Sequence, residues 1–362
     1  MIRSALFVAA AILAAATFAC TPPPPAPPPP PAPFAAAATC PDGTSFLKSV
    51  SYLTTPFSPA PGLPLPPSGP LPAPGPGVPD YAGGLAAAFN AASPAFQKTL
   101  CSLDAVFVNA VPCANPAACL ASSWGWWQSQ PTTPHGRVVA LSAGLWNEPD
   151  YSHYETDLTQ SLLPTSGVSY AGAQSCSAAG VCRPIDNLAT ALLAALAHEV
   201  GHIAWYQVVP YAQPTGFCSG KFFTGWRSNS VTPPPRWRDL LTLPARDNIR
   251  HGNGGKWPYI HSQPPQLDSI DHPGPGGPGT NNLIYSLLGT GQPWASLFAS
   301  ISPDEDFVET YKFAVLTTAN PPLTAVTITV PGAGAADIVQ DYLVPGRKPS
   351  LVTKVGCVPV AF

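Results

Sequence analysis

Two histidines and a glutamate stand close together in the segment His198-Glu199-Val200-Gly201-His202. The histidine and glutamate frequencies of this chain give on the order of 0.002 chance matches to H-E-x-x-H. In a helix, residues four apart lie about 40° apart around the axis, so both imidazoles can bind one metal ion. Glu199 lies beside them and can take a proton from a water molecule. The segment therefore predicts a metal centre at His198 and His202, with Glu199 as general base.

A purely structural interpretation of this segment stays open. The three polar residues can be hydrogen-bonded positions of a core helix, although such groups are costly to bury without a metal or another partner. Gly201 also needs a reason, because glycine inside a helix costs ~1 kcal/mol relative to alanine. Close approach of a substrate strand or of a second helix would explain it, and so would simple tight packing.

A catalytic zinc site normally takes three protein ligands and leaves one position for water, so a third ligand is required. The chain has only five glutamates, and two of them, Glu305 and Glu309, lie in the segment Ser302–Tyr311. His251, His261 and His272 are alternative ligands in a loop-rich part of the chain, although lone loop histidines are more often solvated. Glu305 and Glu309 are the favoured candidates.

The two segments together carry a family resemblance. H-E-V-G-H followed downstream by Glu305-Asp306-Phe307-Val308-Glu309 resembles the gluzincin metallopeptidases, especially the lethal-factor-like branch with E-x-F-x-E on a second helix. The resemblance covers only these two segments. It implies that Glu305 is the third ligand of a Zn²⁺ ion, and that Glu309 accepts a hydrogen bond from a ligating histidine and fixes its tautomer.

The resemblance also implies a fold and an activity. The expected fold is α+β and zincin-like, with a small sheet over two metal-bearing helices, and the expected reaction is hydrolysis of a peptide or protein substrate. In the lethal-factor-like branch a tyrosine shortly before the first glutamate stabilises the oxyanion, but the segment Trp294–Ser302 contains none. Tyr285, Tyr311 and His261 are the remaining candidates for that role.

Two alternatives remain open beside this interpretation. Ser302-Pro303-Asp304-Glu305 is also a capping box, in which Glu305 would bend back to the Ser302 amide and leave Glu309 as the ligand. The same metal-containing fold can also serve as a non-catalytic binding module at a cell surface. A sugar-stacking platform at Trp124, Trp126 and Trp127 is disfavoured, because aromatic clusters usually belong to a core or an interface.

Hydrophobic patterning predicts the elements that must position these residues. An apolar run without internal proline predicts the main buried helix over Leu188–Val208, with Asp186 or Asn187 as its N-cap. The second metal-bearing helix is expected over Ser302–Thr318. The other expected elements are a helix in Leu85–Leu100 and strands at Leu103–Val108, Arg137–Leu145 and Thr324–Val330. The first two strands form the expected small sheet, whose edge can hold an extended peptide.

Composition bounds the domain organisation. A chain of 362 residues with 45% hydrophobic content can bury a sizeable core. A net charge of −3 and a charged fraction of 10% provide no basic stripe, so nucleic acid is not an expected partner. The 50 prolines and 30 glycines predict long loops. We expect one catalytic domain over 40–362, with a proline-rich loop at 56–79 and an irregular insertion at 210–293.

The N-terminal residues resemble an export signal. Arg3 precedes the short apolar stretch Ala5–Phe18, which predicts a signal peptide over 1–19. Thr17-Phe18-Ala19-Cys20 resembles a bacterial lipobox, which implies a lipid anchor on Cys20 and attachment to a membrane. Residues 20–39 are rich in proline and alanine and are expected to form an extended tether. The expected localisation is extracytoplasmic, either lipid-anchored to a bacterial membrane or secreted.

Cysteine usage agrees with an oxidising compartment. Nine cysteines minus a lipidated Cys20 leave eight, an even number that suits disulfide bonds. Cys113 with Cys119, and Cys176 with Cys182, enclose short loops that are easy to close. The remaining four are expected to pair among themselves: Cys40, Cys101, Cys218 and Cys357. A cysteine zinc site is disfavoured because the chain has no C-x-x-C pair.

Overall fold

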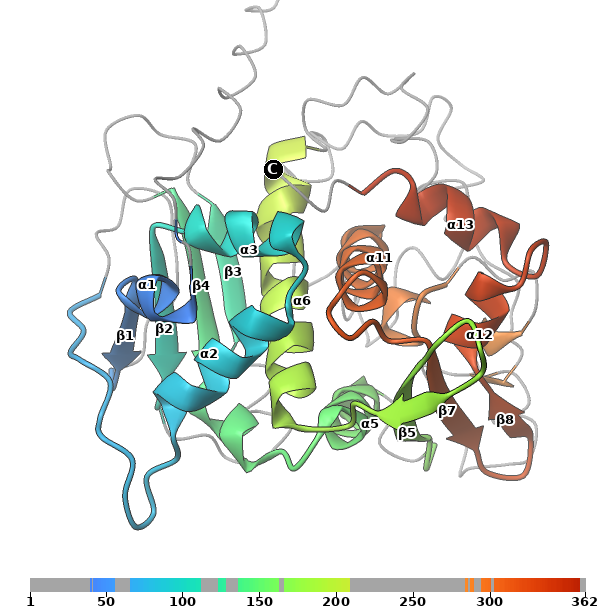
Figure 1. The fold of residues 1–362 in the computed structure, drawn as a ribbon, viewed down its shortest axis with the longest axis horizontal. Coiled ribbons are helices and arrows are strands. Elements are labelled where there is room, and N and C mark those ends of the chain that lie inside the picture. The colour runs from blue at the N-terminus through green and yellow to red at the C-terminus, as the bar shows by residue number, and fades with distance from the viewer. Residues whose placement is uncertain are drawn as a thin grey trace, which may run out of the picture. The chain divides into compact units, whose positions relative to one another are not determined.

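A computed structural model of the chain describes residues 40, 42–55, 66–111, 123–127, 136–162, 166–208, 284–285, 287–289, 294–300 and 303–358. All of these residues belong to one compact unit, Ala32–Phe362. The fold is α+β and contains two four-stranded sheets (Figure 1). The expected signal peptide, the tether at 20–39 with Cys20, the beginning of the proline-rich loop and most of the insertion at 210–293 lie outside the described residues.

The first sheet has the strand order β1-β2-β4-β3. Its strands are β1 (Val50–Leu53), β2 (Ala105–Asn109), β3 (Trp124–Trp127) and β4 (Arg137–Ser142). The strands β1, β2 and β4 are parallel, and β3 pairs with β4 in the antiparallel direction at the edge. The two predicted strands are thus confirmed as the centre of this sheet, and β4 ends earlier than predicted because a 3-10 helix, η1 (Ala143–Asn147), follows it.

The tryptophan-rich segment forms the edge strand β3. The Trp124 ring lies 6.4 Å from the ring of Phe107 on β2. It packs against a small apolar cluster on one face of the sheet, made of Leu53, Ala105, Phe107, Val138 and Ala140. Trp124 is therefore largely a packing residue of the sheet.

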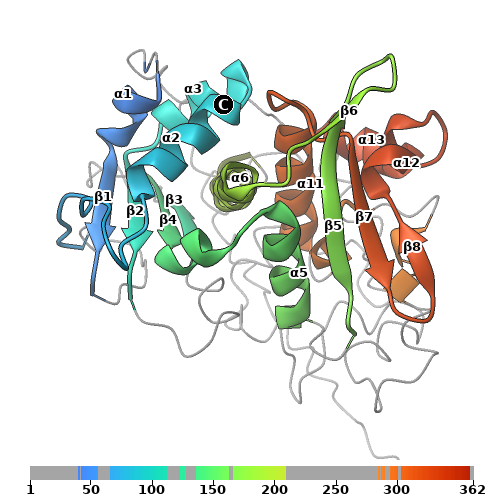
Figure 2. The same cartoon turned by 60° about the horizontal axis from the view of Figure 1, so that its bottom comes forward.

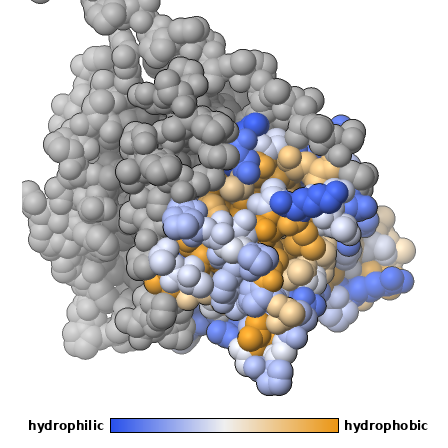
Figure 3. Space-filling model, turned by 90° about the vertical axis from the view of Figure 1, so that its left-hand side faces the viewer, coloured by the Kyte–Doolittle hydropathy of each residue, from blue (hydrophilic) through white to orange (hydrophobic). Residues whose placement is uncertain are grey.

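On the side of the molecule where β1 and α1 lie, the described surface mixes hydrophilic and hydrophobic residues, as on an ordinary protein surface (Figure 3).

Three helices lie along the other face of the first sheet (Figure 2). They are α1 (Gly43–Leu47), α2 (Tyr81–Ala91) and α3 (Pro94–Cys101). The helical structure predicted in Leu85–Leu100 is confirmed, but it is divided between α2 and α3, because the chain is extended at Ala92 and a new helix begins at Pro94. Ser93 caps the new helix by accepting a hydrogen bond from the Phe96 amide at 3.3 Å, and proline is well suited to the first helical position.

The helix α6 (Leu188–Val208) runs through the middle of the described fold and has the predicted bounds (Figure 1). Asn187 is its N-cap, since its Oδ1 accepts a hydrogen bond from the Thr190 amide at 3.0 Å. Asp186 instead accepts hydrogen bonds from Ser152. By length and composition alone, Leu188–Trp205 could cross a membrane, but 83% of it is buried inside the protein. This is the burial expected of the central helix of a folded core.

The second metal-bearing helix, α11 (Pro303–Thr317), packs directly against α6. A Cβ atom on Gly201 would lie 3.2 Å from the Cα atom of Val308 on α11, so the second helix explains this glycine. On another side of α6, a Cβ atom on Gly125 of β3 would overlap the carbonyl of Glu199. Two glycines thus let a helix and an edge strand approach the H-E-x-x-H turn closely.

The sequence predicted only one strand of the second sheet. Its order is β6-β5-β7-β8, all antiparallel. The strands are β5 (Ser169–Cys176), β6 (Cys182–Pro184), β7 (Ala325–Val330) and β8 (Gly334–Ala336). The strand β7 confirms the predicted strand at Thr324–Val330. The helix α5 (Tyr151–Leu162) and α11 lie between this sheet and α6 (Figure 2). The last helices are α12 (Ile338–Leu343) and α13 (Pro349–Val355).

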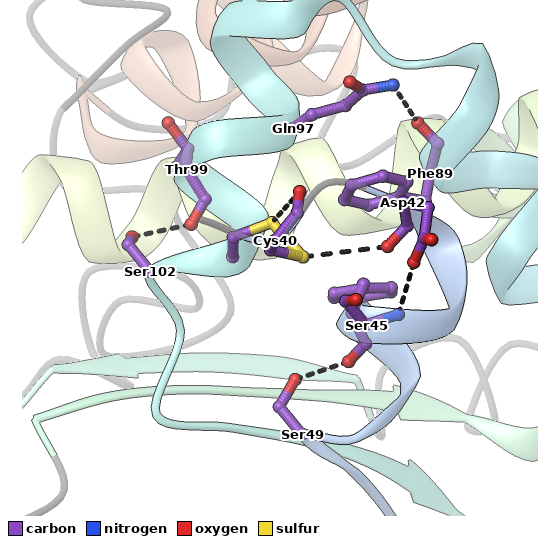
Figure 4. The surroundings of a disulfide bond; sticks show 10 residues. Cys40, Asp42, Ser45, Ser49, Phe89, Gln97, Thr99 and Ser102 are labelled. Atoms are coloured by element: carbon purple, nitrogen blue, oxygen red, sulfur yellow. Dashed lines mark hydrogen bonds between the residues drawn. A yellow bond between two sulfur atoms is a disulfide. The ribbon is translucent and has the colours of Figure 1, made fainter. Parts of the chain in front are cut away.

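Two disulfide bonds connect described cysteines. Cys176 and Cys182 are bonded across the β5–β6 hairpin, as predicted from their spacing. Cys40 is bonded to Cys101 at the end of α3, and nearby Asp42 caps α1 by accepting a hydrogen bond from the Ser45 amide (Figure 4). Cys357 is disulfide-bonded as well. The remaining predicted disulfide cysteines, Cys113, Cys119 and Cys218, lie outside the described residues.

Candidate metal centre

Three of the predicted site residues converge at the contact between α6 and α11. One ligand atom each of His198, His202 and Glu305 lies within 4.8 Å of the other two. Glu305 Oε2 is 3.7 Å from His198 Nε2, and Glu305 Oε1 is 4.0 Å from His202 Nε2. The two imidazole rings have centroids 5.0 Å apart and planes at 78° to each other. The fold thus directs two ring nitrogens and one carboxylate toward a common point.

This donor set fits a divalent metal ion. In a tetrahedral zinc site, bonds of ~2.0–2.2 Å place neighbouring ligand atoms about 3.4 Å apart. The separations of 3.7 Å and 4.0 Å are only slightly larger, so small side-chain rotations close the difference. Imidazole nitrogen with carboxylate oxygen is a donor combination that several divalent transition metals accept. The group can therefore hold a metal ion, and its geometry alone leaves the identity of the ion open.

Burial prepares His198 for metal binding. The residue is 7% exposed, and desolvation lowers the pKa of its imidazole below the usual value although Glu309 and Glu305 act in the opposite direction. A neutral imidazole keeps the lone pair that a metal ligand needs. Glu305 is 2% exposed, whereas the side chain of His202 is 17% exposed. Solvent and ligands can therefore approach from the His202 side.

Glu309 occupies the position that the family resemblance implied for it. Its Oε1 accepts a hydrogen bond from His198 Nδ1 at 2.8 Å, which leaves His198 Nε2 directed at Glu305. Its Oε2 accepts a hydrogen bond from Ser296 Oγ at 2.5 Å and lies 2.8 Å from Lys312 Nζ. Burial alone would raise the pKa of Glu309, but Lys312 and the hydrogen bond from His198 lower it to about 2. A carboxylate in this position fixes the tautomer and orientation of a ligating histidine.

Two further charged residues extend the contacts of Glu309, and neither was predicted from the sequence. Lys312 lies three residues after Glu309 on α11, and its Nζ is also 2.7 Å from Oε1 of Glu155 on α5. The spacing of Glu309 and Lys312 is visible in the sequence, because residues three apart on a helix are neighbours. The partner Glu155 is 157 residues away along the chain, so no local pattern could have identified it.

Glu199 is buried on α6, one residue after His198, and is 6% exposed. Its backbone carbonyl faces Gly125 of the edge strand β3, where any side chain would collide with it. The residue expected to act as general base therefore lies where the metal-binding turn of α6 meets β3, the last strand in the order of the first sheet. This proximity was not visible in the sequence.

Neither of the two tyrosines considered for oxyanion stabilisation is shown in contact with the metal-binding group. Tyr311 is fully buried, and its ring packs against Phe96 at 6.1 Å between centroids. Its position on α11 is about 200° around the helix axis from Glu309, so it faces away from the metal-binding side. Tyr285 donates a hydrogen bond to the Ala335 carbonyl of β8 at 3.2 Å. His261, the third candidate, and the alternative ligands His251 and His272 lie outside the described residues.

The orientation of the Glu305 carboxylate bears on the capping-box alternative. Ser302, the expected cap, lies outside the described residues, and α11 begins at Pro303. The Glu305 carboxylate itself lies within 4.0 Å of both imidazoles. This orientation favours the ligand interpretation of Glu305, and it leaves Glu309 to the hydrogen bond with His198.

No family model, curated protein or solved structure matches the chain at a significant level. The resemblance to gluzincins therefore rests on the two motif-bearing segments of the sequence.

Proposed function

We propose that this protein is a zinc-dependent metallopeptidase of the zincin-like type. The observation that carries the proposal is the convergence of His198 and His202 from an H-E-x-x-H helix with Glu305 from a second helix. Glu199 belongs to the same turn, and Glu309 holds His198 by a hydrogen bond of 2.8 Å. Together these residues supply the three protein ligands and the adjacent carboxylate that peptide hydrolysis by a zinc enzyme requires.

The chain's own residues have distinct roles in this proposal. His198, His202 and Glu305 would hold the ion, which would supply Lewis acidity and make the attacking water easier to deprotonate. Glu199 accepts a proton from the attacking water as the new bond to the carbonyl carbon forms. It then delivers the proton to the amide nitrogen as the carbon–nitrogen bond breaks. Glu309 keeps the His198 ring oriented throughout.

The first sheet offers a place for an extended substrate. β3 is the last strand in the order β1-β2-β4-β3, and it is the strand whose Gly125 contacts the Glu199 carbonyl. A peptide that added to the outer edge of β3 would be held by main-chain hydrogen bonds close to the metal-binding turn. We therefore propose a peptide or protein substrate bound in extended conformation along β3.

The site of action is proposed to be extracytoplasmic. The disulfide bonds Cys40–Cys101 and Cys176–Cys182 support an oxidising compartment. The sequence before them supports export through a signal peptide and attachment to a membrane through a lipid on Cys20. Fractionation of cells that express the wild type and Cys20→Ser tests the anchor, which is contradicted if the variant stays in the membrane fraction.

The activity is tested with Glu199→Gln, which keeps the size and polarity of the side chain but cannot act as a base. Cleavage of a proteome-derived peptide library should fall by a factor of ~10² to 10⁴, while zinc content stays equal to that of the wild type. Glu148→Gln, a half-buried glutamate outside the metal-binding group, serves as the matched control and should retain activity.

Two outcomes of this experiment contradict the proposal. If Glu199→Gln cleaves peptides at nearly the wild-type rate, Glu199 is not the base. If the wild type binds zinc but cleaves nothing in the library, the alternative of a non-catalytic metal-containing binding module on the same fold is favoured.

A further inference from the structure

The hydrogen-bond network of the metal centre continues beyond Glu309 into a buried cluster that we call the Lys312 cluster, made of Lys312, Glu155 and Glu309. Lys312 Nζ lies 2.7 Å from Glu155 Oε1 and 2.8 Å from Glu309 Oε2. The three residues are 3%, 2% and 0% exposed, respectively. The cluster therefore connects His198 on α6, through α11, to the helix α5.

Burial makes each member of the Lys312 cluster depend on the others. A charged group taken out of water is costly unless it is paired and hydrogen-bonded. The adjacent cavity, lined by Glu155, Glu309 and Lys312 among others, measures only about 20 Å³, roughly the space of one water molecule. Burial alone would lower the pKa of Lys312, but Glu155 and Glu309 raise it well above its usual value. The lysine therefore remains a cation beside Glu309. Burial raises the pKa of Glu155 to about 7, although Lys312 acts to lower it.

The two oxygens of Glu309 have separate tasks. Oε2 is held by Ser296 and Lys312, and Oε1 is thereby directed at His198 Nδ1. A carboxylate is planar, so fixing one oxygen restricts the position of the other. Loss of the Lys312 contact would leave Oε2 to Ser296 alone and allow the carboxylate to turn. The ring of His198, and with it Nε2, would then lose its fixed orientation.

We propose that Lys312 is a positioning residue of the metal centre, which holds Glu309 against His198 and is itself anchored to α5 by Glu155. The inference rests on the proposed function only in that the group His198, His202 and Glu305 binds zinc. It adds a layer of residues that no sequence motif indicated. It also gives α5 a role in the metal centre, although α5 contributes no ligand.

The competing explanation is that the Lys312 cluster only ties α5 to α11. Both explanations predict that Lys312→Met destabilises the protein, because two buried carboxylates lose their cation. They differ for the double variant Lys312→Met with Glu155→Met, which removes the charge pair and replaces it by apolar side chains of similar length. Apolar replacement of a buried ion pair often restores stability, and Glu309 keeps its hydrogen bonds with Ser296 and His198 in this variant. A structural tie would then leave zinc affinity at the wild-type value, whereas a positioning role would leave it reduced.

The experiment measures zinc dissociation constants of the folded proteins by competition with a chelator, together with the absorption spectrum of the Co²⁺-loaded form. We expect the double variant to bind zinc ~10 to 100-fold more weakly than the wild type, as is typical when a partner of a ligating histidine is lost. In a Glu309→Gln background, the same two substitutions should change zinc affinity by less than about 3-fold, because Glu309 transmits their effect.

A matched control is Lys354→Met. Lys354 is another buried lysine whose Nζ contacts a carboxylate of α11, Asp306 Oδ2, at 2.5 Å. It should lower thermal stability and leave the zinc affinity of the folded protein unchanged. The proposal is overturned if the double variant binds zinc as tightly as the wild type, or if Lys354→Met weakens zinc binding equally. If the wild type itself binds no zinc, the proposed function fails instead, so the two failures are distinguishable.

Discussion

Two buried lysine–carboxylate clusters on α11 differ in what they touch. The Lys312 cluster connects through Glu309 to His198 of the metal-binding group. The second cluster joins Asp306 to Lys354 of α13, and Lys354 Nζ lies 4.7 Å from the centroid of the Trp294 ring. All of these ionic residues are at most 3% exposed.

The comparison shows that burial of charge does not by itself indicate function. In both clusters a carboxylate offsets the desolvation of a lysine, so loss of one partner would leave a buried charge uncompensated at a contact between α11 and another helix. Only the Lys312 cluster is continuous with residues that can hold a metal. The contact between Glu309 and His198, rather than the presence of buried charge, is what gives the Lys312 cluster a role in the proposed chemistry.

Separate substitutions of the adjacent residues Glu305 and Asp306 should give the largest difference in zinc affinity and stability between the two variants. Glu305→Gln removes a proposed ligand, so the zinc dissociation constant should rise by well over ~100-fold. A rise of ~100-fold is the upper end of what is typical when a residue hydrogen-bonded to a ligand is lost. Asp306→Asn should leave Lys354 buried without its charge partner and cost ~3 to 5 kcal/mol of stability, with zinc affinity of the folded protein unchanged. Chelator competition and urea unfolding measure the two effects. Equal zinc affinities for the two variants would remove the distinction between the clusters.

Acid pH should weaken the Lys312 cluster in a defined window. The pKa of Glu309 is about 2 in the folded protein against a usual value of 4.5, so its contribution is complete above pH 4.5 and is lost as pH falls through about 2. Urea unfolding of the metal-free wild type and Glu309→Gln between pH 2 and 6 should show a stability difference that shrinks toward pH 2. A difference that is constant with pH would contradict the proposed ionisation of Glu309.

Ionisation of Glu148 should have a small effect on stability, opposite in sign to the effect of Glu309. Burial, and then the charge of Asp157, raise the pKa of this half-buried carboxyl to about 7. Because the folded protein holds this proton more tightly than the unfolded chain, Glu148 lowers stability as pH rises from 4.5 to 7, and the cost is complete above pH 7. Glu148→Gln should therefore stabilise the protein at pH 8, by less than about 1 kcal/mol after solvent screening. Thermal unfolding at pH 5 and 8 measures it, and a stabilisation confined to pH 5 would contradict the sign.

The sequence predicted the elements with a strong local pattern. The bounds of α6 matched because its apolar run is long and lacks proline, and α11, β2, β4 and β7 were found for similar reasons. The division between α2 and α3 was missed, although Ser93-Pro94 is a helix-start signal in the middle of the predicted helix. The short strands β1 and β3 were also missed, because a four-residue run carries too little periodicity to predict a strand.

The candidate site divides in the same way. His198, Glu199 and His202 could be named in advance from their spacing on one helix, and Glu305 and Glu309 from the resemblance of their segment to a known family. Glu155 and Gly125 could not, because their importance comes from contacts that only the tertiary fold creates.

The most direct test of the central claim is the zinc stoichiometry of the purified protein, compared with that of the His202→Gln variant. The account predicts one equivalent of tightly bound zinc per wild-type chain, and a variant that folds but retains little zinc after dialysis against a chelator. A wild-type protein that carries no zinc and takes up none when it is supplied would contradict the metal centre and the proposed peptidase activity together.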